Sequence, residues 1–149
     1  MKISTKGRYA LRLMLDIAQH GEDGGCVSLK DVSVRQQVSM KYLEQIVTQL
    51  SRAGLLKSVR GAQGGYRLTR RPEEYRVGDV LRITEGNLAP VACLEDSENR
   101  CERSHECATL DFWTGLYAVI NQYIDRFTLA DLVRTEQEKE HPAQHRAEC

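Results

Sequence analysis

VSMKYLEQIVTQLSRAGLLKSVRGAQGGYRLT, residues 38 to 69, is the stretch that decides the fold. Ser39 is a favourable helix N-cap, Gly54 is a favourable end, and between them one apolar face repeats at helical spacing: Leu43, Ile46, Val47 and Leu50. The rest predicts two short strands, over 55–60 and 65–69, joined by a glycine-rich turn. A helix followed directly by a β-hairpin is therefore expected.

Two further helices are predicted before this stretch. Residues 5–20 have apolar side chains at helical spacing, and Gly21 stops the pattern. Ser28, with Asp31 three positions later, begins a short helix that runs to about Gln36. Helix, turn, helix and hairpin is the order of a winged helix-turn-helix domain. The fold class is mainly α with a small β-hairpin wing.

The charge is distributed unevenly along the chain. The 149 residues carry no net charge, but residues 1–86 have 15 Lys and Arg against 9 Asp and Glu, whereas residues 87–149 have 6 against 12. A basic front half indicates that this part alone contacts nucleic acid, although an uneven solvated surface would give the same count.

The second helix of such a pair places its N-terminal residues against base edges in the major groove. The glycine-rich hairpin tip has basic flanks and suits contact with the phosphate backbone or the minor groove. Glu44 could accept from a cytosine amino group, or only favour the helix dipole. The candidate DNA-binding residues are Ser39, Met40, Lys41, Tyr42, Glu44, Arg60, Gly61, Gly64 and Arg67.

The C-terminal half predicts a short helix from VGDVLRIT that packs on the hairpin, and a long amphipathic helix over 109–127. The long helix has an apolar stripe formed by Trp113, Leu116, Ile120, Ile124 and Phe127. A stripe of this length needs a partner, and a second copy would present two recognition helices to two half-sites, although packing on its own domain is the alternative. We therefore expect a homodimer, a palindromic double-stranded DNA operator and a C-terminal dimerisation helix.

These patterns divide the chain into four parts. Residues 1–86 form the DNA-binding domain, 87–108 a cysteine-containing loop, 109–133 the dimerisation helix with a short closing helix, and 134–149 a charged tail expected to be disordered. No apolar run is long enough for a membrane span or a secretory signal, so a cytoplasmic protein without membrane contact is expected. No nucleotide loop or catalytic triad is visible, which argues against an enzyme.

Three of the five cysteines lie close together, at Cys93, Cys101 and Cys107. In a reducing compartment such a group is more often a metal or redox site than a disulfide framework. Five acidic residues within this loop are expected to raise the thiol pKa values, which disfavours a freely reactive cysteine.

Several motifs resemble one bacterial family. MKISTKGRYALRLMLDIA, VSMKYLEQ, SVRGAQGGYRL, VGDVLRITEG and TLADLV are similar to the winged-helix regulators that include the iron-sulfur cluster regulator IscR, the nitric oxide sensor NsrR and the cysteine metabolism repressor CymR. The resemblance covers nearly all of residues 1 to 133. It implies a homodimeric transcription factor whose cysteine loop, where present, carries an iron-sulfur cluster.

The resemblance implies that Cys93, Cys101 and Cys107 are cluster ligands, with [2Fe-2S] favoured over [4Fe-4S]. The first gap, of seven residues, is longer than in IscR and NsrR. IscR completes its site with a histidine where this chain has Leu110, and NsrR uses an acidic residue where it has Arg8. His105 is the candidate fourth ligand, with another residue, water or a small thiol as alternatives.

Two other interpretations stay open. In the CymR branch a regulator without a cluster is controlled by a protein partner or by thiol oxidation. Three cysteines and one histidine could also hold a structural zinc ion. Metal and sulfide analysis separates these interpretations.

Overall fold

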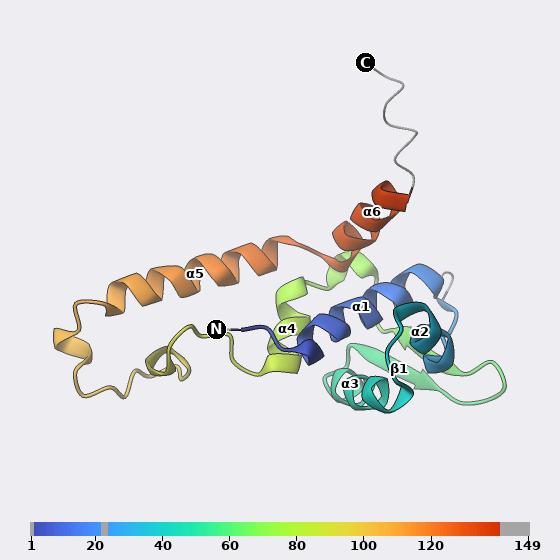
Figure 1. Cartoon of the computed structure of the whole chain (residues 1–149), viewed down its shortest axis with the longest axis horizontal. Coiled ribbons are helices and arrows are strands. Elements are labelled where there is room, and N and C mark those ends of the chain that lie inside the picture. The colour runs from blue at the N-terminus through green and yellow to red at the C-terminus, as the bar shows by residue number, and fades with distance from the viewer. Residues whose placement is uncertain (1, 22–23, 141–149) are drawn as a thin grey trace, which may run out of the picture.

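The computed structural model describes residues 2–21 and 24–140, and it is mostly helical with one two-stranded antiparallel sheet (Figure 1). This confirms the predicted fold class. The helices and strands are α1 (Thr5–His20), α2 (Leu29–Gln36), α3 (Met40–Arg52), β1 (Leu56–Val59), β2 (Gly65–Leu68), α4 (Val77–Glu85), α5 (Leu110–Arg126) and α6 (Leu129–Glu140).

The turn between α2 and α3 is built from local hydrogen bonds. Gln37 ends α2 in the left-handed region, at φ 53°, and the Ser33 hydroxyl donates to the Val38 carbonyl at 2.6 Å. The Ser39 side chain then accepts from the Tyr42 N–H and caps α3. The predicted caps at Ser28 and Ser39 are both confirmed. A turn of three residues therefore fixes the direction of α3.

The hairpin is fastened to the domain at its base. Val27, in the segment after α1, exchanges two backbone hydrogen bonds with Tyr66 on β2, at 2.9 and 2.8 Å. The Tyr75 side chain is fully buried, and its hydroxyl accepts from the Thr69 and Arg70 N–H groups while it donates to the Leu55 carbonyl. Because these bonds hold both strands at their base, only the tip of the wing extends from the body.

The core lies between the first three helices, the hairpin base and α4. The apolar faces of α1 and α3 supply most of it, and the fully buried side chains there include Leu13, Met14, Ile17, Leu43, Ile46 and Leu50. Helix α4 packs mainly against α1, α3 and α5. The expectation that it packs on the hairpin is therefore wrong, because the Tyr75 segment occupies the hairpin base.

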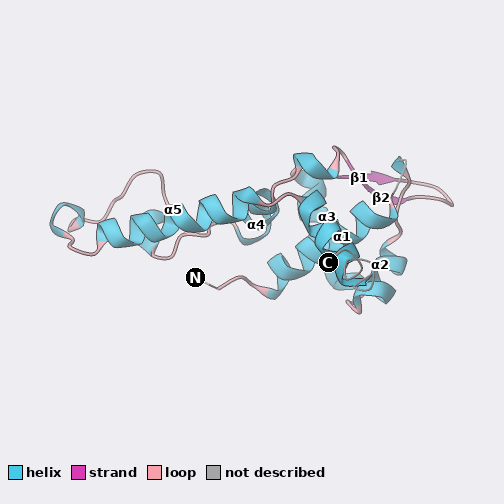
Figure 2. Ribbon diagram, turned by 90° about the horizontal axis from the view of Figure 1, so that it is seen from above, coloured by secondary structure: helices cyan, strands magenta, loops and turns pink. Residues whose placement is uncertain are grey.

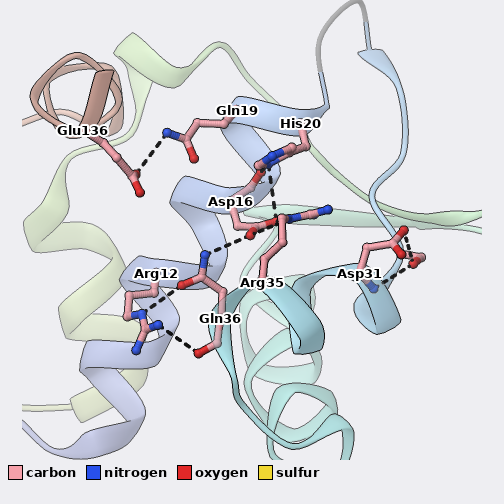
Figure 3. Close-up of polar contacts among 9 residues, drawn as sticks. Arg12, Asp16, Gln19, His20, Asp31, Arg35, Gln36 and Glu136 are labelled. Atoms are coloured by element: carbon pink, nitrogen blue, oxygen red, sulfur yellow. Dashed lines mark hydrogen bonds and ion pairs between the residues drawn. The ribbon is translucent and has the colours of Figure 1, made fainter. Parts of the chain in front are cut away.

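A buried ionic network joins α1 to α2 (Figure 3). The Asp16 carboxylate has no solvent-exposed surface, and the Arg35 guanidinium donates to both of its oxygens, with the shortest distance 2.6 Å. Gln36 also donates to Asp16, at 2.9 Å. Burial alone would raise the Asp16 pKa, but the bonds from Arg35 and Gln36 and the Arg35 charge outweigh it, so the pKa lies below its usual value. The network anchors α2, and with it the turn into α3.

A long part of the chain has no buried residue. Every residue from 89 to 128 is at least partly exposed, and this range includes all of α5. Figures 1 and 2 show α5 extending away from the other helices, with residues 87–109 looping around its far end. An isolated helix of this length is marginal in water, so α5 needs a surface to pack against.

Helix α6 corrects one predicted boundary. It continues to Glu140, so residues 134–140 are helical where the sequence predicted the start of a disordered tail. The Gln19 amide on α1 donates to Glu136 at 3.0 Å, which holds α6 against the domain. The rest of the predicted tail, 141–149, lies outside the described residues. Among the described helices, none has the length and apolar character needed to cross a bilayer.

Candidate nucleic-acid interface and cysteine loop

The exposed face of α3 is polar and lies opposite its buried stripe. Lys41, Glu44, Gln45 and Thr48 are all exposed and line a shallow groove along the helix. Lys41 and Glu44 were predicted from their position near the helix start, whereas Gln45 and Thr48 were missed. Helical periodicity could have found both, because they share the face opposite Leu43, Ile46, Val47 and Leu50.

The other predicted residues at the start of α3 have different surroundings. Ser39 is the N-cap and Met40 is 40% exposed. Tyr42 is half-buried, and its ring packs edge-on against Tyr9 of α1, with centroids 5.9 Å apart. Tyr42 therefore contributes to the contact between α1 and α3.

The tip of the wing is narrow and carries a positive charge. Arg60 is exposed, and Gly61 has φ 116°, in the region that favours glycine. A Cβ at Gly64 would collide with the Val59 carbonyl oxygen, and its N–H donates to the Gly61 carbonyl at 3.0 Å. The glycines thus make a turn with little side-chain bulk, as the sequence predicted.

Arg67 does not lie at the wing tip. It pairs with Lys57 in the register of the hairpin and lines a groove with Ile17, Ala18 and Gly21 at the C-terminal end of α1. It is only half exposed, and it is not among the residues that line the groove along α3. The structure therefore brings Arg67 to a different groove from Lys41.

The cysteine loop consists of short turns with little internal packing. Cys93 lies in a 3-10 turn (Ala92–Leu94) and is half-buried, and Cys101 is exposed beside Asn99, whose side chain accepts from its N–H. Cys107 is exposed directly before α5, at the end of a second 3-10 turn (Ser104–Glu106). Leu88, near the start of the loop, is its only buried residue.

Cys107 differs from the prediction made for the thiols. Its sulfur lies 3.4 Å from the Thr109 hydroxyl, and hydrogen bonds from the Thr109 side chain and backbone hold the pKa of Cys107 below that of an ordinary thiol. The Leu110 N–H and the Arg103 charge act in the same direction. For Cys107 the expectation that acidic neighbours raise the pKa is wrong, because hydrogen bonds at the start of α5 favour the thiolate.

The donor set of the loop fits iron or zinc in its chemistry, since it offers three free thiols, two of them exposed. The positions of these thiols do not form a metal-binding site. Within residues 2–21 and 24–140, no three His, Cys, Asp or Glu side chains lie close enough together to hold a metal ion. The His105 ring is largely exposed and faces Glu106, at 3.6 Å, rather than a cysteine.

The two candidate functional regions lie at opposite ends of the molecule. Figure 1 shows the wing at one end and the cysteine loop at the other, with α1, α3 and α4 between them and α5 leading back from the loop. Any influence of the loop on the wing or on α3 must therefore pass through α4, which precedes the loop, or through α5, which follows it.

Comparisons with known proteins agree with this architecture. The family model described as "Rrf2: Iron-dependent Transcriptional regulator" matches residues 3–135. The chain is 43% identical over 133 residues to the transcriptional regulator CymR of Bacillus subtilis, covering 89% of each chain. The solved structure of that global cysteine regulator matches with a TM-score of 0.74, over 91% of this chain and 98% of the other, at 36% identity. IscR of T. potens matches with a TM-score of 0.73 and 40% identity, over 93% and 90% of the two chains.

Proposed function

Because the chain belongs to the Rrf2 family of transcriptional regulators, we propose that it is a cytoplasmic homodimer that binds a palindromic operator. The relatives described above are transcriptional regulators rather than enzymes. Two copies of α3 would enter the major groove of two half-sites, and the two wing tips would contact the flanking backbone. The observation that carries this proposal is that α3 has an exposed polar face and that the wing, whose tip is basic and has little side-chain bulk, follows it.

The dimer is supported by the unburied range 89–128. The large exposed apolar side chains of α5 are Phe112, Leu116, Val119 and Tyr123, with exposed fractions from 38 to 64%. Their spacing of four, three and four is that of a coiled-coil seam. The predicted stripe shares Leu116 with this set, whereas its other members, Trp113, Ile120, Ile124 and Phe127, are only half exposed. We therefore place the seam between the two copies at the four exposed residues.

Salt dependence tests the proposed DNA face. Replacing Lys41 or Arg60 with alanine is expected to weaken binding and to lower the slope of log affinity against log salt concentration by about one unit for each phosphate that is no longer neutralised. The probe is a duplex that the unmodified chain selects from a random library, and affinity is measured by fluorescence anisotropy at several salt concentrations. Arg126→Ala, on α5, is the control and should leave the slope unchanged. Equal slopes for all three variants would remove Lys41 and Arg60 from the interface.

We further propose that the cysteine loop is the sensory part and holds an iron-sulfur cluster through Cys93, Cys101 and Cys107, with His105 as the candidate fourth ligand. The support is the donor set and the absence of buried residues from 89 to 109, since no core packing opposes a closer approach of the thiols. When bound, such a cluster would supply redox and iron sensitivity. The remaining residues of the loop would then carry the change to α5.

A second candidate is a regulator without a cluster that senses thiol oxidation or a protein partner. The lowered pKa of Cys107 favours it, because a lower pKa increases the fraction of thiolate, the form that reacts with oxidants. The similarity to CymR, a global cysteine regulator, points the same way.

Anaerobic purification separates the two candidates. The cluster proposal expects coloured protein with iron and sulfide in equal amounts, and a loss of at least half of both in Cys101→Ala. Cys26→Ala is the matched control, because Cys26 lies outside the loop and should keep both. Stoichiometric zinc, or colourless protein that takes up no iron on reconstitution, would contradict the cluster. Faster alkylation of Cys107 than of Cys101 at neutral pH would then support the thiol regulator.

A further inference from the structure

Helix α4 is fixed to the DNA-reading part of the chain, by which we mean α1, α2, α3 and the wing. One contact is to α3 and the other is to the start of α1. The Gln49 side chain on α3 donates to the Ile83 carbonyl at 2.6 Å. The Ser4 hydroxyl, at the start of α1, donates to Glu85 at 2.6 Å. Because α4 contacts both α1 and α3, a change in its position would be transmitted directly to the recognition helix.

Helix α5 is joined to this part at two separate places. The first is a backbone pivot, in which the Val77 N–H donates to Phe127 and the Leu129 N–H donates to Tyr75, both at 2.9 Å. Leu129 is buried in the core and secures this pivot. The pivot fixes where α5 ends, and the contacts between α5 and α4 then set its angle.

The second place is a side-chain brace from α4. The Arg82 guanidinium donates to both oxygens of Asp125, at 2.9 and 2.8 Å, and to the Asn121 side-chain oxygen at 2.8 Å. Arg82 and Asp125 are each about two-thirds shielded from solvent. A two-pronged bond between planar groups restricts direction as well as distance. Gly78 allows the close approach, since a Cβ there would collide with the Asp125 carboxylate.

We propose that Arg82 is a positioning residue that sets the angle between α5 and the DNA-reading part, and thereby the spacing of half-sites that the dimer accepts. This inference rests on the proposed function. With 17 residues, α5 is about 25 Å long, so a rotation of about 10° around the pivot moves its far end by about 4 Å. That displacement is comparable with the rise of about 3.4 Å per base pair. Loss of the brace therefore matters on the scale of single base pairs.

The test compares operators that differ only in spacing. Palindromic duplexes are built from the half-site that the unmodified chain selects, with the centre-to-centre distance lengthened or shortened by one and two base pairs. The unmodified dimer is expected to lose about tenfold in affinity for each base pair of change. Arg82→Gln should flatten this profile, so that each base pair of change lowers affinity by less than about threefold. Its affinity for the best operator should fall by much less than the tenfold that one base pair costs the unmodified dimer. Arg126→Gln removes the same charge from an exposed position at the pivot end of α5 and should keep the steep profile.

One further measurement and two further variants make the result decisive. Sedimentation confirms that each variant remains a dimer, and if Arg82→Gln does not, Asp125→Asn and Asn121→Ala are compared in the same way. A profile as steep in the brace variants as in the unmodified chain would overturn the inference and leave the proposed function intact. An unmodified chain that binds no duplex, or binds as a monomer, would overturn the proposed function itself.

Discussion

Replacing Asp16 with alanine is expected to lower the free energy of unfolding by about 3 kcal/mol, near the lower end for a buried ion pair that loses one partner. The carboxylate is completely buried and accepts from Arg35 and Gln36, so the substitution removes the bonds from both residues. The bonds from Arg12 on α1 to Gln36 on α2 remain. The Arg35 side chain is 33% exposed and can turn to water, which limits the loss. Urea unfolding at neutral pH, followed by far-UV circular dichroism, measures the change.

The matched control is Asp31→Ala on α2. Asp31 is an exposed carboxylate that bonds to the Ser28 cap, so its loss should cost no more than about 1 kcal/mol. A loss for Asp16→Ala no larger than that of the control would show that the network in Figure 3 does not hold α2 in place.

The Asp16 contribution also has a definite pH dependence. Its pKa is lower in the folded chain than in the unfolded chain, where it is about 3.9. The stabilisation is therefore fully present above that value and is lost as the pH falls through the lower pKa of the folded state. The difference in unfolding free energy between Asp16→Asn and the unmodified chain should accordingly shrink in this acid range.

The second large effect is expected on the apolar seam of α5. Val119→Glu would place two carboxylates between the paired helices, where neither has a partner, and should convert the dimer to monomers. Because each half-site would then be bound alone, affinity for the palindromic duplex should fall by at least about 100-fold. Sedimentation velocity and fluorescence anisotropy measure the two quantities on the same samples.

Thr114→Glu provides the control on the same helix. Thr114 is exposed and lies five positions before Val119, on another face of α5. It adds the same charge outside the seam and should leave both dimer and affinity unchanged. A dimeric Val119→Glu variant with normal DNA affinity would exclude the proposed seam.

Local patterns predicted the parts of the fold that local chemistry decides. The caps at Ser28 and Ser39, the buried stripe of α3 and the glycine turn of the wing each depend on residues within a few positions of one another. The sequence could not reveal the Asp16 network or the Arg82 brace, whose partners lie 19 and 43 positions away. A charged residue in an amphipathic helix gives no local sign that it will be buried.

The C-terminal half shows the same limit. Two stripes on α5 have helical spacing, and the packing of α4 decides which one stays exposed. The sequence does not show where α4 packs, and the predicted dimer stripe was therefore the one through Ile120, which is half-covered. The Cys107 thiol lies among acidic residues in the sequence, but its pKa depends on the hydrogen bonds at the start of α5. Whether the three cysteines meet depends on loop geometry that their spacing does not determine.

The most direct test of the central claim is the stoichiometry on DNA. A fluorescent duplex selected by the unmodified chain is titrated in analytical ultracentrifugation, with detection at the wavelength of the label. Two copies of the chain per duplex, bound together and protecting two segments about one helical turn apart in a hydroxyl-radical footprint, is the predicted result. A single copy on the duplex, or a chain that selects no duplex from the library, would contradict it.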